Sequence, residues 1–195
     1  MEALYLNTHL QRFGEEQVAQ AISLLPQWRR EQAQRFRFLA GRRECALSYI
    51  ELLRALRLEY GIWDTPRFEY NQHGKPFLPD LPHIHFSISH CSVAAGCLVS
   101  DKPCGLDVER IRHAKESLVR YCMCQSEAEE ILSSPCPDLA FTRLWTQKEA
   151  VFKLLGTGIR DNIKTILRSP IMDTITLTTM ENPIDGYVVS TALQL

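Results

Sequence analysis

Apolar residues recur along the chain at spacings that predict alternating helices and strands. Residues 14–25 repeat at helical spacing, and Pro26 ends that pattern. A longer helical pattern runs from about residue 29 to residue 58, and Gly41 is placed to divide it into two helices. Short strands are predicted at residues 1–6, 67–70, 84–89 and 94–99.

The second half of the chain repeats this order of elements. A strand is predicted at residues 106–109, helices at about 115–132 and 138–155, and strands at 163–167, 175–178 and 187–193. Strand, helices and three strands thus occur twice, which predicts an α+β fold of two similar halves related by pseudo-twofold symmetry. The turn at Lys102-Pro103 divides the chain into residues 1–102 and 103–195, and we expect the active site in the cleft between the halves.

Composition restricts the class of protein. The chain has 195 residues, of which 45% are hydrophobic and 23% charged, as expected for a globular protein with one good core or two small ones. The net charge of −1 does not indicate a nucleic-acid partner, and no apolar stretch is long enough to span a membrane. Seven cysteines lack the spacing of a disulfide framework or a zinc site, and no secretory signal opens the sequence. We therefore expect free thiols and a cytoplasmic location.

Positive charge is concentrated in one segment. Between Trp28 and Arg57 the chain has eight arginines and three glutamates. Such a segment is either a solvated helix face or a surface that meets a phosphate-bearing ligand or an acidic protein, and the sequence leaves both interpretations open.

Two further segments carry charge in a pattern that core packing does not require. In Gly105-Leu106-Asp107-Val108-Glu109, Asp107 and Glu109 lie on one face of a strand. In the segment from Trp145 to Lys153, Trp145, Glu149 and Lys153 lie on one stripe of a helix. Either segment alone is common as surface charge. Together, three carboxylates and a lysine predict a site for magnesium and phosphate.

Two shorter motifs add polar groups to this picture. Ser87-Ile88-Ser89-His90 ends a predicted strand, and Gly74-Lys75-Pro76 is a loop with one cation. His90 fits either a phosphate contact or a hydrogen-bonded structural role. The chain has no Gly-x-x-x-x-Gly-Lys-Ser/Thr motif, which excludes a P-loop as the phosphate-binding device.

Together these motifs resemble the 4′-phosphopantetheinyl transferase superfamily, in its surfactin-synthetase-activating (Sfp-like) branch and the compact bacterial holo-acyl-carrier-protein synthase type. The resemblance covers about residues 35–158 and implies a role for each matching position. The implied magnesium ligands are Asp107, Glu109 and Glu149. The implied catalytic residues are Glu149 and Lys153. The implied coenzyme A contacts are Arg42, Arg43, Lys75, Ser89, His90, Lys148 and Lys153. Glu127 resembles an acid of a less regular middle motif, from which Tyr121-Cys122-Met123-Cys124 departs.

The resemblance implies a magnesium-dependent enzyme with coenzyme A as co-substrate. It would transfer the phosphopantetheine arm to a serine of an acyl or peptidyl carrier protein and release adenosine 3′,5′-bisphosphate. The arginine-rich segment then has a possible docking role, and Glu149, directly or through a metal-bound water, is the expected base. Two other functions use the same residues: a magnesium-dependent pyrophosphate or phosphodiester hydrolase of a nucleotide, and a non-catalytic binder of coenzyme A or a carrier. We expect a monomer that uses neither nucleic acid nor membrane.

Overall fold

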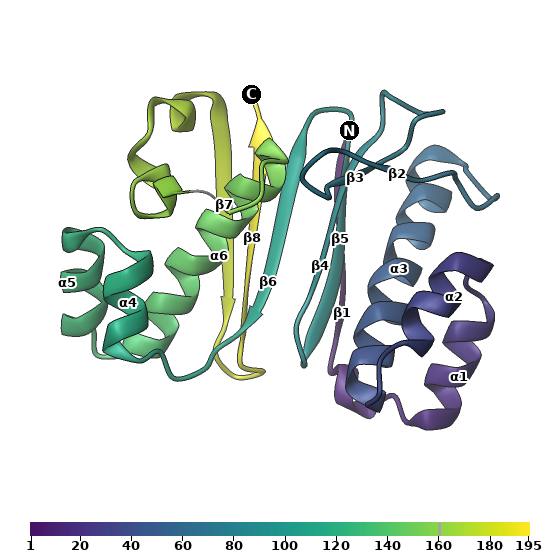
Figure 1. Ribbon diagram of the computed structural model, residues 1–195, viewed down its shortest axis with the longest axis horizontal. Helices are drawn as coiled ribbons and strands as arrows, with labels where there is room; N and C mark the ends of the chain where they lie inside the picture. The colour runs from purple at the N-terminus through teal and green to yellow at the C-terminus, as the bar shows by residue number, and fades with distance from the viewer. Residues whose placement is uncertain (160) are drawn as a thin grey trace.

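Figure 1 shows the computed structural model, which describes residues 1–159 and 161–195. The strands are β1 (Glu2–Thr8), β2 (Glu69–Tyr70), β3 (Pro76–Phe77), β4 (His85–His90), β5 (Ala94–Ser100), β6 (Cys104–Arg110), β7 (Ile175–Asn182) and β8 (Tyr187–Gln194). The α-helices are α1 (Glu15–Ser23), α2 (Gln27–Gln34), α3 (Leu39–Tyr60), α4 (Glu116–Cys122), α5 (Gln125–Ser133) and α6 (Pro137–Leu155). Short 3-10 helices occupy Leu10–Arg12, Asp161–Lys164, Ile166–Arg168 and Pro170–Thr174. This mixture of helices and antiparallel sheets confirms the predicted α+β class.

The described residues form two three-stranded sheets and one two-stranded hairpin, β2–β3. The sheets have the orders β1-β5-β4 and β6-β8-β7, and every pairing within them is antiparallel. In both sheets the strand that comes last in the sequence lies in the centre, between the first and the second. Because the central strands β5 and β8 have a neighbour on each side, they are almost wholly buried.

The two sheets pack against each other, and helices cover their outer faces. Side chains alternate along β5: Ala94 and Leu98 meet side chains of the second sheet, whereas Cys97 and Val99 pack in the cluster formed with α3. On the other side, α6 packs against Ala192 of β8. Figure 1 accordingly shows α1, α2 and α3 on one side of the sheets and α4, α5 and α6 on the other.

β4 and β6 meet where the two sheets adjoin, and two serine hydroxyls join them. Ser87 Oγ accepts a hydrogen bond from Leu106 N at 2.9 Å, and Ser89 Oγ accepts one from Val108 N at 3.1 Å. Because both partners advance by two residues in the same direction, the strands run parallel here. We call this contact the seam; it brings the end of β4 beside the acidic face of β6.

Three predicted elements differ from the structure. The long helical pattern breaks at residues 35–38 and not at Gly41, which lies inside α3 where Phe36 covers it; a Cβ there would lie 2.6 Å from Phe36 Cδ1. Residues 115–132 form the two helices α4 and α5. Residues 163–167 lie in 3-10 helices, so the predicted strand there is wrong, and the second half ends in two strands.

Within the described part of the chain, no helix has both the length and the apolar character needed to cross a membrane.

Candidate active site

A glycine allows α6 to lie directly on β6. A Cβ on Gly105 would stand 2.0 Å from Ala150 O and 2.4 Å from Leu154 N, both backbone atoms of α6. Any larger side chain therefore forces the helix away from the strand. This close approach sets the acids of β6 beside Glu149 and Lys153, and we call Asp107, Glu109, Glu149 and Lys153 the acid–lysine cluster.

Asp107 and Lys153 form a direct ion pair in which a serine takes part. Lys153 Nζ lies 2.6 Å from Asp107 Oδ1 and donates to Ser89 Oγ at 2.9 Å. Ser89 Oγ in turn donates to Asp107 Oδ1 at 3.0 Å. Asp107 is buried, and its other oxygen, Oδ2, has no hydrogen-bond partner. A buried carboxylate oxygen without a partner is costly unless something binds it.

Burial and mutual repulsion perturb the other two acids. Burial, then the neighbouring Asp107 charge, raise the pKa of Glu149 to about 6, while Lys153 opposes the rise. Burial and Asp107 also raise the pKa of Glu109, against the effects of Arg112, a hydrogen bond from Trp145, and Lys153. Asp107 thus raises the pKa of both glutamates, which marks a strongly negative site, and a bound cation would relieve that repulsion.

The acid–lysine cluster fits a hard divalent cation by its chemistry. Asp107, Glu109 and Glu149 offer only carboxylate oxygens, the ligands that magnesium prefers, and Asp107 Oδ2 lacks any other partner. Within residues 1–159 and 161–195, no three His, Cys, Asp or Glu side chains already surround one ion position. These acids must therefore adjust their side-chain torsions to share an ion.

Two adjoining cavities meet at this cluster. One, the lysine cavity, has a volume of about 360 Å³ and includes Lys75 and the backbone of Gly74, Gly156 and Gly158. The other, the acid cavity, has about 410 Å³ and includes His90, Asp107 and Glu109. The residues that line both are Ile88, Glu149 and Lys153. The cluster thus lies at the junction of two spaces, one with a cation and exposed backbone and one with acids.

Lys75 and His90 lie at these cavities as expected, although each has a protein partner. Lys75 Nζ donates to Leu154 O at 3.0 Å and to Cys104 O at 3.1 Å, so it ties its loop to the end of α6. Burial lowers the pKa of Lys75. His90 Nδ1 lies 3.5 Å from Glu44 Oε2. What either side chain contacts in a ligand remains a prediction.

Lys148 lines neither of the two cavities. Its side chain is fully buried, with Nζ 2.6 Å from Glu127 Oε2 and donating to Cys122 O at 3.1 Å. Glu127 Oε2 also accepts from Cys124 N at 3.0 Å. This ion pair joins α6 to the junction of α4 and α5, on another side of α6 from Glu149. The position of Lys148 contradicts the expectation of a phosphate-side cation and gives Glu127 a structural role.

The Arg42-Arg43 pair also lies outside both cavities. Arg42 is exposed and donates through Nε to Phe36 O at 2.9 Å, whereas Arg43 is buried and donates to Phe13 O at 3.3 Å. Both side chains therefore hold loop backbone in place. A different arginine of the same segment, Arg29 on α2, lines the acid cavity.

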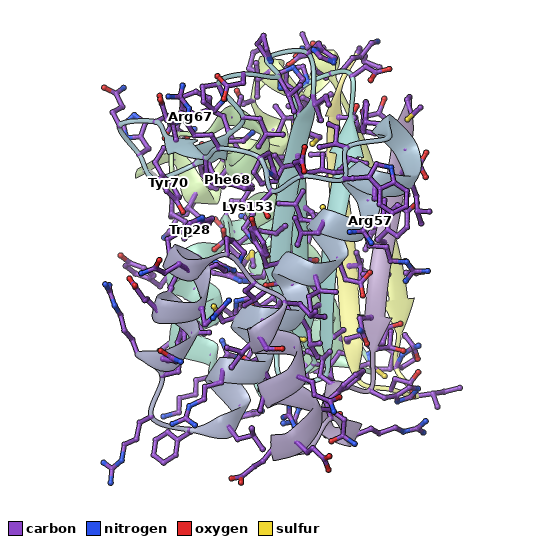
Figure 2. The ribbon with its side chains drawn as sticks, turned by 90° about the vertical axis from the view of Figure 1, so that its right-hand side faces the viewer. Trp28, Arg57, Arg67, Phe68, Tyr70 and Lys153 are labelled. Atoms are coloured by element: carbon purple, nitrogen blue, oxygen red, sulfur yellow. The ribbon has the colours of Figure 1, made fainter. Side chains whose placement is uncertain are left out.

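Sequence reasoning did not single out Arg29 because the arginines of this segment look alike. Arg29 NH1 donates to Gln32 Oε1 at 2.7 Å, NH2 donates to Cys45 O at 3.1 Å, and Nε is buried without a partner. A tertiary contact of the neighbouring residue helps to place it: the ring of Trp28 lies 5.5 Å from that of Phe68. In Figure 2, Trp28 and Phe68 lie on the same side of the molecule as Lys153, with Tyr70 beside them and Arg57 apart.

Comparison with known proteins agrees with this geometry. A family model described as the 4′-phosphopantetheinyl transferase superfamily matches residues 103–183, which include the acid–lysine cluster. The 4′-phosphopantetheinyl transferase psf-1 of Bacillus pumilus is 31% identical over 134 residues, which is 67% of this chain and 58% of that protein. The 4′-phosphopantetheinyl transferase Sfp of Bacillus subtilis (strain 168) is 25% identical over 149 residues, 75% of this chain and 66% of that protein.

A relative from another bacterial group has similar coverage. The 4′-phosphopantetheinyl transferase AcpT of Escherichia coli (strain K12) is 33% identical over 143 residues, 68% of this chain and 66% of that protein. In all three comparisons the chain covers less than two thirds of the relative's own length.

Proposed function

This chain belongs to the 4′-phosphopantetheinyl transferase superfamily, and we propose that it transfers the 4′-phosphopantetheine arm of coenzyme A to a serine of an apo acyl or peptidyl carrier protein. One observation carries the proposal: Glu149 and Lys153 line both of two adjoining cavities, and Asp107 and Glu109 lie beside them in one. A transferase needs such a junction, because donor and acceptor must meet at one phosphorus atom.

Glu149 and Lys153 have different roles in the reaction. The serine oxygen attacks the phosphorus that carries the pantetheine arm, the bond from that phosphorus to the bridging oxygen breaks, and adenosine 3′,5′-bisphosphate leaves with the electron pair. Glu149, whose pKa is raised to about 6, accepts the serine proton near neutral pH. Lys153 Nζ, at the same junction, stabilises the negative charge on the phosphoryl oxygens.

Magnesium is the cofactor that the acids Asp107, Glu109 and Glu149 support. Bound there, it would neutralise charge on the pyrophosphate as the phosphorus is attacked. The support for it is the all-oxygen donor set and the unpartnered Asp107 Oδ2.

We assign coenzyme A to the two cavities. The Lys75 ammonium favours an anionic group in the lysine cavity. His90 and Arg29 provide nitrogen donors in the acid cavity. The pyrophosphate then lies between them, against Lys153.

We further propose that residues 1–102 and 103–195 are two halves related by pseudo-twofold symmetry, with the active site in the cleft between them. The shared strand order of β1-β5-β4 and β6-β8-β7 supports this.

The proposal includes a monomer in the cytoplasm whose partners are coenzyme A and a carrier protein, without nucleic acid or membrane. All seven cysteines are free thiols, which supports a reducing compartment. Light scattering in solution tests the monomer.

Intact mass spectrometry tests the function. The protein is incubated with coenzyme A, magnesium and a panel of apo carrier proteins, with Asp107→Asn as the inactive control. We expect a mass gain of one phosphopantetheine on a carrier serine. Loss of coenzyme A in the absence of any carrier would favour a pyrophosphate or phosphodiester hydrolase instead. Binding of coenzyme A without turnover across the panel would favour a non-catalytic binder.

A further inference from the structure

The hydroxyl of Ser89 is committed to protein partners. Ser89 is 7% exposed, and its Oγ accepts from Lys153 Nζ and from Val108 N of the seam. A hydroxyl has one proton, and here that proton is donated to Asp107 Oδ1 at 3.0 Å. In this structure the proton and both lone pairs of the Ser89 hydroxyl are therefore engaged with Asp107, Lys153 and Val108.

The effect of Ser89 on Asp107 is to fix the orientation of one carboxylate. Oδ1 receives two hydrogen bonds, from Ser89 and from Lys153 at 2.6 Å, whereas Oδ2 receives none. Two donors on one oxygen hold the carboxylate against rotation. Oδ2 thereby stays without a hydrogen bond from the protein, which a bound cation would replace.

We propose that Ser89 is a positioning residue that holds the Asp107 carboxylate in the orientation that leaves Oδ2 for a divalent cation. This inference rests on the proposed function, because it takes Asp107 as a metal ligand. Hydrogen bonds of this kind to metal ligands typically contribute 10- to 100-fold to metal affinity, which is the size of the expected effect.

The chain contains a matched control two residues away. Ser87 lies on the same strand, is 6% exposed, and accepts the equivalent seam hydrogen bond from Leu106 N at 2.9 Å. Among the described residues, its hydroxyl makes no hydrogen bond to an acid of the cluster. Ser87→Ala therefore removes one hydrogen bond of the seam and leaves Asp107 oriented.

The experiment measures Mn²⁺ affinity of the full chain by electron paramagnetic resonance without coenzyme A, so that turnover plays no part. The variants are Ser89→Ala, Ser89→Thr, Ser87→Ala and Asp107→Asn. We expect Ser89→Ala to weaken Mn²⁺ binding about 10-fold or more, Ser87→Ala to change it less than about twofold, and Ser89→Thr to restore most of the affinity because the hydroxyl remains. Circular dichroism establishes that each variant is folded; if Ser89→Ala does not fold, Ser89→Cys, with its weaker donor, replaces it.

The outcomes separate this inference from the function on which it rests. If Asp107→Asn binds Mn²⁺ as tightly as the parent protein, the proposed metal site is wrong. If Asp107→Asn loses Mn²⁺ but Ser89→Ala matches Ser87→Ala, the metal site stands and the positioning role of Ser89 is overturned. A rise in KM for coenzyme A with unchanged Mn²⁺ affinity would likewise overturn it, since that result indicates a direct contact with the substrate.

Discussion

The buried ion pair between Lys148 and Glu127 allows a sharp test of the structure, because the sequence motif alone suggests a different role for Lys148. The Lys148 side chain is fully buried and the Glu127 side chain is 7% exposed. Lys148→Met roughly keeps the length of the side chain but leaves the Glu127 carboxylate, among the described residues, with the Cys124 amide as its remaining hydrogen-bond partner. Removing one partner of a buried pair typically costs about 3–5 kcal/mol, because the other charge stays buried and unpaired.

Such a loss is large beside the total stability of roughly 5–15 kcal/mol expected of a domain. For a chain of this size each kcal/mol corresponds to about 2–4 °C in Tm, so Lys148→Met should lower Tm by roughly 6–20 °C. The double variant Lys148→Met/Glu127→Leu removes both charges. The double variant should recover most of the lost free energy of unfolding, because no buried charge is left unpaired. It should remain about 1 kcal/mol less stable than the parent protein, because it also loses the hydrogen bond by which Glu127 caps the start of α5.

Urea unfolding followed by circular dichroism measures these changes, and Lys102→Met, at an exposed turn, controls for loss of a lysine charge. The reasoning is refuted if Lys148→Met is as stable as the parent protein, or if the double variant is no more stable than the single one. If stability is unchanged while coenzyme A binding weakens, Lys148 contacts the phosphate after all.

Three further predictions concern the cluster itself. Gly105→Ala should cost about 1–3 kcal/mol or more in urea unfolding, because its Cβ meets backbone of α6, and should reduce carrier modification; unaltered stability would contradict the close approach of α6 to β6. The pKa of Glu149 is raised to about 6, so this acid gains a proton as pH falls through that value. Mn²⁺ affinity should then decrease below about pH 6. In the absence of metal, the folded protein should become more stable as pH falls from about 6 to the ordinary pKa of a glutamate, because the folded state binds the proton more tightly than the unfolded chain. An Mn²⁺ affinity that does not change from about pH 5 to 7 would contradict the raised pKa of Glu149. Glu149→Gln should lower kcat by about 10²–10⁴-fold while calorimetry still detects coenzyme A binding, and near-normal kcat would exclude Glu149 as the base.

Local geometry was enough to predict which acids of the cluster lie together on β6 and which residues lie together on α6. Alternation along β6 puts Asp107 and Glu109 on one face, and helical spacing puts Trp145, Glu149 and Lys153 on one stripe. The same spacing also contained a signal about Lys148, because adjacent residues on a helix differ by about 100° and do not share a face. Helical geometry, read strictly, separates Lys148 from Glu149, whereas the family motif groups them.

Other features depended on contacts between distant segments. Nothing local in the arginine-rich segment distinguishes Arg29, which lines the acid cavity, from Arg42, which holds the Phe36 carbonyl. Each case is decided by which surface the side chain meets after the helices pack on the sheet.

The sequence by itself determined the α+β class, most of the elements and the chemistry of the acids and lysine, because backbone periodicity decides which side chains share a face. Only the tertiary structure decided which cations reach the cleft and how the acids are held. Ser89 shows why: its partners Asp107 and Lys153 are 18 and 64 residues away along the chain. The seam and the contact at Gly105 bring these segments together, and such long-range packing leaves no periodic signal in the sequence.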